Sequence, residues 1–151
     1  MEPQPCVFIP RKLSDNSLAQ PSEEGKRQLE PFHAFIKENK IPIDILEDKA
    51  FSGGVEIHRH EADLWGCIEG EVTFVVGGKA KDPKVRNKNG VINDLELRAT
   101  EIEGGTEHVL HAGDWLWIPA GQPHLHKTEK MARLWVIKIP VLEPVPLSFF
   151  V

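Results

Sequence analysis

Two histidines one residue apart, followed by acidic residues, are the part of this sequence best suited to carry chemistry. Residues 54–70 read GVEIHRHEADLWGCIEG and contain His58, His60 and Asp63. Side chains at positions i and i+2 of a β-strand point to the same face, so His58 and His60 would share a face with Glu56. Two such imidazoles can reach one ion at roughly 2.1 Å each. The spacing therefore predicts a metal site on a β scaffold.

The position of Asp63 depends on a chain reversal after His60. On one straight strand these two side chains would face opposite ways, because their separation is odd. A two-residue hairpin at Glu61-Ala62 would make them opposed partners on one face and would place His58 opposite Trp65. Glutamate and alanine are not the residues that so tight a turn favours. We predict Asp63 as the carboxylate ligand, with Glu61 as the alternative.

A second stretch adds a third imidazole. Residues 113–126 read GDWLWIPAGQPHLH and contain His124, the third candidate metal ligand. His126 shares a strand face with His124, since one residue separates them. We expect His126 to lie further along the strand and to contact a substrate or act as a general acid or base. His126 is therefore the candidate catalytic residue.

Three tryptophans and a cysteine occupy i, i+2 pairs on the expected strands: Trp65, Cys67, Trp115 and Trp117. Core packing is the simplest interpretation of all four. The functional alternative is a wall of the ligand pocket, for which Trp65, Cys67 and Trp117 are the candidates. Cys67 would share the face of Asp63 on a regular strand, although a small apolar thiol is more commonly just buried.

Short strands make up most of the chain that must position these residues. Isoleucine alternates with other residues from Ile41 to Ile45, and a turn signal follows at 51–54. Further strand candidates are 54–60, 63–68, 71–76, 95–103, 106–110, 114–118, 124–127 and 131–139. Many short strands separated by glycine and proline turns indicate a sandwich or barrel.

The remaining segments divide the chain into regions. We expect residues 1–40 to form an N-terminal arm with a short helix at 31–39, residues 41–140 to form the barrel domain, and residues 141–151 to form a tail. The helix prediction depends on Pro31 at the first helical position and on an apolar i, i+3, i+4 stripe that would cover the core. The basic segment 79–94 is interpreted as a solvated surface insertion. The alternative is a cover that attracts an anionic substrate.

Composition excludes several classes of protein. The 151 residues suffice for one domain, and a net charge of −5 without a basic stripe argues against nucleic-acid binding. No apolar run approaches the ~20 residues of a membrane span. The two cysteines form no disulfide or metal motif, so we expect a reduced, cytoplasmic setting. Apolar residues near both ends, which a small barrel cannot easily bury alone, favour a homodimer.

The two histidine-containing stretches resemble the two sequence motifs of the cupin superfamily. The second cupin motif is matched in full by four residues: Gly113, Pro119, Gly121 and His124. The first motif is matched in order by another four: His58, His60, Asp63 and Gly70. This chain departs from the family pattern in several places. Thr128 stands where the pattern has asparagine, Asp63 replaces glutamate, the gap before it is shorter, and the leading glycine is shifted.

The resemblance covers residues 41–140 and implies an all-β fold, the double-stranded β-helix or jelly-roll barrel. It also implies one metal held by three histidines and a carboxylate, which carries over to His58, His60, Asp63 and His124. Nitrogen and oxygen donors without thiolate suit several divalent transition metals. We favour Fe(II), with Mn, Ni, Zn or Cu as alternatives.

The function expected from this site is that of a metal-dependent enzyme. Within that class we favour a mononuclear non-haem dioxygenase, with an isomerase or lyase as alternatives. Its substrate would be a small polar chelating molecule, for which the metal acts as Lewis acid and template. The competing hypothesis is a non-catalytic cupin module that binds a sugar or another small ligand. Turnover with loss of O₂ would support the enzyme, and stoichiometric binding without product would support the module.

Overall fold

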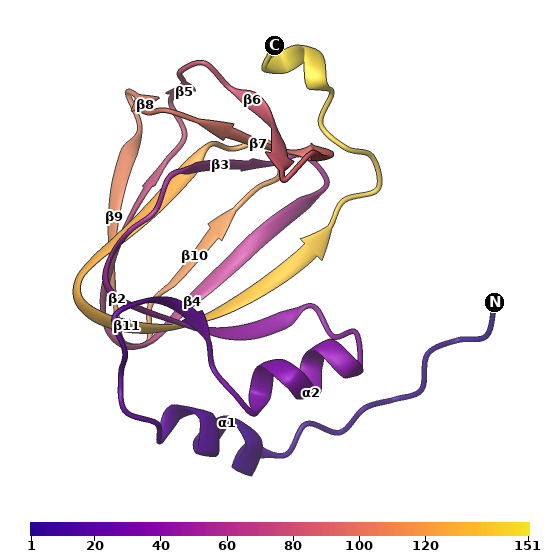
Figure 1. Cartoon of the computed structure of the whole chain (residues 1–151), viewed down its shortest axis with the longest axis vertical. Coiled ribbons are helices and arrows are strands. Elements are labelled where there is room, and N and C mark those ends of the chain that lie inside the picture. Colours follow the sequence, from indigo (N-terminus) through magenta and orange to yellow (C-terminus); the bar gives the residue numbers. More distant parts are fainter.

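Antiparallel β-strands form a barrel in the computed structural model, which describes residues 1–151 (Figure 1). The strands are β1 (Gly25–Gln28), β2 (Ile43–Ser52), β3 (Val55–His58), β4 (Glu61–Val76), β5 (Lys79–Ala80), β6 (Lys84–Lys88), β7 (Val91–Ala99), β8 (Ile102–Glu103), β9 (Thr106–His111), β10 (Trp115–Ile118) and β11 (His124–Pro140). Two short helices, α1 (Arg11–Leu18) and α2 (Phe32–Glu38), precede the barrel, and a 3-10 turn, η1 (Leu147–Phe149), follows it. The predicted all-β jelly-roll class with an N-terminal helix is confirmed.

Two long strands, β4 and β11, pair with each other and with four of the other strands. β11 pairs with β2, β3 and β4, while β4 pairs with β9, β10 and β11. Each long strand had been expected as two short ones, with breaks near residues 70 and 130. At these points the β4–β11 register shifts, and Gly70 has φ of +79°. A Cβ on Gly70 would lie 1.9 Å from the Met131 carbonyl oxygen. Glycine therefore lets the strands bend together without ending.

The predicted hairpin at Glu61-Ala62 is wrong. β3 ends at His58 and pairs with β7 and β11, so it does not pair with β4 at all. The connecting residues find other partners: the Arg59 N–H donates to the Leu95 carbonyl, and the His60 carbonyl accepts from Val141. Because these backbone groups are satisfied by β7 and the C-terminal tail, the chain continues into β4 here without pairing β3 with β4.

The helical segment covers one outer side of the barrel. Phe32 and Ile36 of α2 pack with Ile45 and Leu29 in a small apolar cluster, and the Phe32 ring meets Trp135 edge-on at 5.5 Å between centroids. The helix predicted at 31–39 is thus found as α2, with the covering role expected of its apolar stripe. Neither α1 nor β1 was expected from the sequence. The region boundaries near residues 40 and 140 stay predictions.

A buried ion pair holds the N-terminal segment against the barrel. Arg133 on β11 donates through Nε to Glu47 Oε2 on β2 at 2.7 Å, and the Glu47 side chain is fully buried. The same guanidinium donates to the carbonyls of Leu18 and Gln20. One arginine therefore ties α1 to two central strands.

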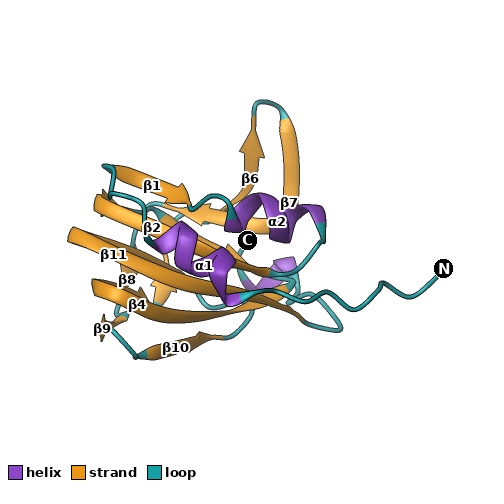
Figure 2. Ribbon diagram, turned by 90° about the horizontal axis from the view of Figure 1, so that it is seen from below, coloured by secondary structure: helices purple, strands orange, loops and turns teal.

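The segment 79–94 contributes β5, β6 and the start of β7. Figure 2 shows the β6–β7 hairpin projecting from the barrel, and Val91 and Ile92 near its tip are exposed. This arrangement agrees with a surface insertion, although Arg86 reaches back from it towards the barrel. None of the helices is both long and apolar enough to cross a membrane.

Candidate metal centre

Three side chains that commonly bind metals meet inside the barrel. Glu56 and His58 occupy alternate positions of β3, and His124 begins β11 directly opposite Glu56. One ligand atom from each of the three lies within 4.8 Å of the other two. The His58 and His124 rings are 5.3 Å apart between centroids. Two imidazoles and a carboxylate are thus gathered, as the two-residue period of a strand requires for Glu56 and His58.

His124 is prepared to donate a lone pair. Its Nδ1–H donates to the Gln122 carbonyl at 3.0 Å, which leaves Nε2 as the unprotonated nitrogen of the neutral ring. Burial lowers the pKa of His124 to about 4, against the opposing effect of Asp63. Nε2 is buried and has no hydrogen-bond partner. An imidazole oriented by a backbone carbonyl is typical of metal ligands, so His124 fits the predicted role.

The loop before His124 is tied to β3. Gly121 has φ of +86° and donates its N–H to the His58 carbonyl at 2.7 Å. Its left-handed conformation favours glycine. The glycine-proline spacing of the second motif therefore positions the His124 ring against His58 through a backbone contact.

Asp63 lies beside the three clustered residues. Its Oδ2 is 3.5 Å from His124 Nε2 and 3.6 Å from His58 Nε2, and the side chain is 1% exposed. Its Oδ1 accepts from Lys138 Nζ at 2.7 Å. The structure thus brings Asp63, His58 and His124 together, as the motifs indicated, while the role of Asp63 as a direct ligand stays a prediction. Lys138, whose Nζ is also 3.4 Å from His58 Nε2, was not expected there.

Glu56 carries a negative charge into the cluster. Burial alone would raise the pKa of its carboxyl, but His58 and the Arg98 guanidinium outweigh that effect and hold the pKa far below its usual range. Arg98 forms an ion pair with Glu56, and Arg86 forms one with Glu96 at 2.6 Å. Glu96 in turn lies 3.9 Å from His58 Nδ1. Two arginines on the β6–β7 hairpin therefore flank the cluster through their carboxylate partners.

His60 is not among the gathered side chains. Its Nε2 lies 3.3 Å from Glu61 Oε2, and the side chain is 30% exposed. The physical reason is that β3 ends at His58, so the same-face rule does not extend to residue 60. Glu56, on the other side of His58 at the same spacing, takes the place expected for His60. The ligand role of His60 stays a prediction.

His126 lies deeper in the barrel, within an aromatic enclosure. The rings of Phe51, Trp65 and Phe74 surround its imidazole at 5.2 to 5.7 Å between centroids. Its Nε2 is 2.9 Å from Asp48 Oδ2, and both side chains are buried. His126 does share the inner face with His124, as expected, but the sequence contained no local signal for its carboxylate partner. Its catalytic role stays a prediction.

The candidate pocket residues have different surroundings. Trp65 contacts His126 from within the barrel, and Cys67 belongs to the same apolar core. Burial raises the pKa of the Cys67 thiol, so Cys67 packs as a small apolar residue. Trp117, on β10, is 50% exposed, whereas the next residue, Ile118, faces the core. Trp117 therefore lies outside the apolar core, and its role in lining a pocket stays a prediction. Trp115 is likewise half-exposed, which corrects its expected place in the core.

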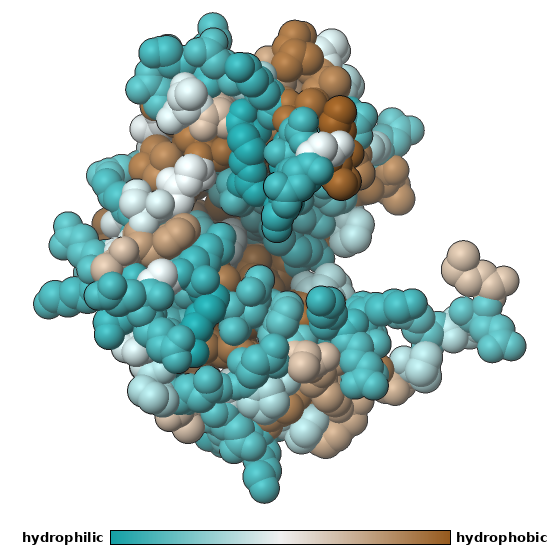
Figure 3. Space-filling model, in the orientation of Figure 1, coloured by the Kyte–Doolittle hydropathy of each residue, from teal (hydrophilic) through white to brown (hydrophobic).

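The residues of the cluster differ in exposure. His58, Asp63 and His124 are buried, whereas Glu56 and Lys138 are about a quarter and a third exposed. The face of the molecule drawn in Figure 3 is hollowed near its middle, with hydrophilic side chains around the hollow. The partly exposed residues of the cluster are therefore Glu56 and Lys138.

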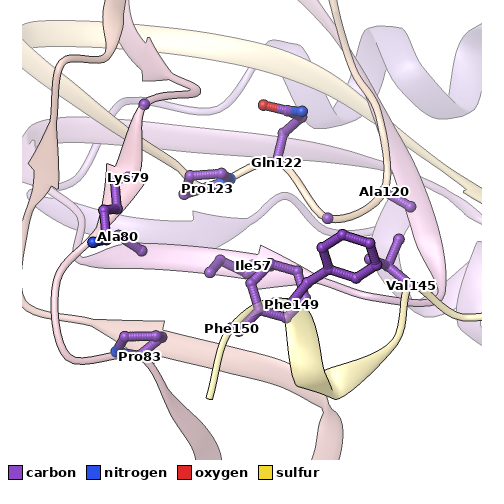
Figure 4. A pocket seen from close by; sticks show the side chains of 12 residues that line it. Ile57, Lys79, Ala80, Pro83, Ala120, Gln122, Pro123, Val145, Phe149 and Phe150 are labelled. Carbon is purple, nitrogen blue, oxygen red and sulfur yellow. The ribbon is translucent and has the colours of Figure 1, made fainter.

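A separate hollow of about 340 Å³ lies on the other side of β3. Ile57 lines it together with Phe149 and Phe150 from the C-terminal segment (Figure 4). Ile57 alternates with His58 along β3, so this hollow faces away from the clustered ligands. It is not the candidate metal centre.

Comparison with known proteins supports the fold. No protein-family model matches the sequence, and no curated protein matches it. Among solved structures, YcfD from Escherichia coli superimposes with a TM-score of 0.55 at 17% identity, over 84% of this chain and 37% of that chain. The TT1209 protein from Thermus thermophilus has a TM-score of 0.49 at 19% identity, over 83% and 92%. The Drosophila melanogaster CENP-C cupin domain has 0.46 at 14% identity, over 68% and 58%.

The superposition on YcfD supports the jelly-roll barrel fold, which is the fold that the resemblance of the two motifs implies. This chain spans only about a third of YcfD and somewhat more than half of the CENP-C chain. At these identities the likeness concerns the fold and leaves the chemistry to the residues of this chain.

Proposed function

We propose that this protein is a mononuclear metal-dependent cupin enzyme that acts on a small polar chelating molecule, with an Fe(II) dioxygenase as the favoured activity. The observation that carries the proposal is the meeting of Glu56, His58 and His124 within 4.8 Å. Two histidines and one carboxylate are the ligand set of many non-haem Fe(II) oxygenases. An isomerase or lyase with the same ligands is the alternative within this class.

The residues present fit a divalent cation. His124 is neutral with a free Nε2, Glu56 is ionised, and Asp63 Oδ2 and His124 Nε2 are buried without hydrogen-bond partners. A bound metal would supply a Lewis acid that orients and polarises the substrate. The chain itself contributes two buried imidazoles, with the partly exposed Glu56 and Lys138 beside them.

One solved structure suggests a first small molecule to test. One structure of YcfD, described as a ribosomal oxygenase, holds cobalt and 2-oxoglutarate, and it superimposes on this chain with a TM-score of 0.54 at 16% identity. 2-Oxoglutarate is a small polar chelator, so it is a suitable first probe. We propose no particular substrate from this likeness.

The decisive experiment measures metal affinity in four proteins. Apo protein is titrated with Co²⁺ and, without oxygen, with Fe(II), against a competing chelator. Wild type should bind one ion per chain. His124→Ala and Glu56→Gln should lose more than the ~100-fold in affinity that outer-shell residues typically contribute, because each removes a ligand. His60→Ala should remain within about tenfold of wild type.

Other results would change the ligand assignment or end the proposal. If His60→Ala empties the site and Glu56→Gln leaves it intact, the ligand set is the one predicted from the motif. Full occupancy in His124→Ala would end the proposal of a metal centre here. O₂ consumption on adding 2-oxoglutarate or another chelating acid to the Fe(II)-loaded protein then tests turnover.

The second candidate is a non-catalytic module that binds a sugar or another small ligand. One observation favours it: the Lys138 ammonium already neutralises Asp63 at the cluster, so the site could bind a ligand without a metal. Calorimetric binding of a small ligand by the metal-free protein, with no product formed, would support this alternative.

The cellular location, the oligomeric state and the partners of the protein are also proposals. We propose a cytoplasmic homodimer that uses small-molecule substrates and binds neither nucleic acid nor membrane. The net charge of −5 supports the absence of a nucleic-acid partner. The exposed apolar residues Leu142 and Phe149 near the C-terminus support the dimer.

A further inference from the structure

Lys138 occupies a position on β11 where the strand pattern expects an apolar residue. Leu134 and Val136 precede it at two-residue intervals, and both are buried in the barrel core. Because side chains alternate along a strand, Lys138 is the next inward-facing residue. Its register partner on β4 is Asp63. A lysine therefore points into the mouth of the barrel, opposite a buried carboxylate.

The ammonium of Lys138 lies among atoms suited to bind a cation. Nζ is 2.7 Å from Asp63 Oδ1, 3.4 Å from His58 Nε2 and 3.5 Å from Glu61 Oε1. Asp63 is 1% exposed, so Lys138 supplies the compensating charge that a buried carboxylate requires. The Lys138 side chain is 32% exposed, which leaves it room to swing out towards solvent.

We propose that Lys138 is a resident cation that competes with the metal for Asp63 and His58, so that a metal ion enters only when the ammonium leaves. This inference rests on the proposed metal centre. Lys138 donates to Asp63 Oδ1, and its Nζ is also 3.4 Å from His58 Nε2. An ion bound to His58 Nε2 would therefore lie close to the ammonium, and like charges repel strongly at short range. Departure of Lys138 frees Asp63 to join Glu56, His58 and His124. Metal affinity is therefore lower than the four side chains alone would provide.

The test measures Co²⁺ affinity in Lys138→Met by competition with a chelator. Methionine keeps the length and apolar stem of lysine but removes the charge, so Asp63 is left buried without a cation. The metal-free variant should melt below wild type, and Co²⁺ should bind about 10–100-fold more tightly, because the ion now supplies the missing charge. The visible absorption of Co²⁺ reports whether its coordination has changed.

Two further variants control the result. Lys138→Arg keeps the positive charge beside Asp63 and should bind Co²⁺ no more tightly than wild type. This variant also keeps the test valid if Lys138→Met does not fold. Lys127→Met removes an exposed lysine from the same strand, where it faces Glu107 at 3.5 Å. Lys127→Met changes the net charge of the protein by the same amount as Lys138→Met, and it should leave the affinity for Co²⁺ unchanged.

The outcomes separate this inference from the metal centre itself. If wild type binds Co²⁺ while Lys138→Met binds it equally or more weakly, Lys138 supports the site and the inference is wrong. Tighter binding by Lys138→Arg would also overturn it. If neither wild type nor Lys138→Met binds Co²⁺, both the metal centre and the inference fail.

Discussion

Replacing Asp48 with alanine should destabilise the barrel. Asp48 is 0% and His126 5% exposed, and their Oδ2 and Nε2 atoms are 2.9 Å apart. The Asp48 oxygens and His126 Nε2 make no hydrogen bond of good geometry, so this close approach is the polar contact that each of them has. In the alanine variant, the imidazole remains buried among Phe51, Trp65 and Phe74 with no carboxylate beside it. Leaving a buried polar group without its partner costs about 1–3 kcal/mol.

This cost corresponds to a measurable change in melting temperature. For a chain of 151 residues, about 2–4 °C is lost per kcal/mol, so Asp48→Ala should melt roughly 2–12 °C below wild type. Urea unfolding followed by tryptophan fluorescence gives the free energy directly, and calorimetry gives the melting temperature. Chelator in every sample removes the contribution of metal binding to stability.

A double variant and a surface control test the reasoning. Asp48→Leu combined with His126→Phe removes both polar groups, so it should recover much of the loss, because well-packed apolar residues often replace a buried pair at little cost. Asp94→Ala removes an aspartate that is 67% exposed and should cost less than about 1 kcal/mol. A loss below about 1 kcal/mol in Asp48→Ala would refute a buried pair in this place.

Three further outcomes follow from the structure. The pKa of His124, about 4 in the folded chain against an ordinary 6.5, means that between these values the unfolded chain takes up a proton that the folded chain does not. The free energy of unfolding of the metal-free protein should fall by up to about 3 kcal/mol as pH drops from 6.5 to 4, and it should stay level above pH 6.5. In His124→Gln, urea unfolding across this range should show that most of this pH dependence is lost. Gly66→Ala should destabilise β10 and change tryptophan fluorescence, since its Cβ would meet the Trp115 ring at 2.6 Å; an unchanged unfolding midpoint and spectrum would contradict this packing. Light scattering at micromolar concentration should give twice the 17.0 kDa chain mass, whereas the single-chain mass would rule out the proposed homodimer.

Local patterns in the sequence were enough to predict the class of fold and the place of His124. The glycine-proline motif encodes a loop whose shape depends on residues within a few positions of one another. Gly121, with its positive φ, ties that loop to His58. The same local reasoning found α2, because an apolar stripe at helical spacing is visible in a short window. These features need no knowledge of distant strands.

The assembled barrel was needed to show which side chains complete the site. The two-residue period predicts faces only while a strand continues, and β3 ends at His58, so Glu56 joins the cluster and His60 does not. Trp117 faces outward because the core lies on the side of Leu116 and Ile118.

The partners of the buried charges lie far away in the sequence. Lys138 is 75 residues from Asp63, and Asp48 reaches His126 only because β2 and β11 are neighbours in the barrel. No local pattern marks such a pair. The physical reason is that a buried charge is satisfied by whichever strand the fold places beside it.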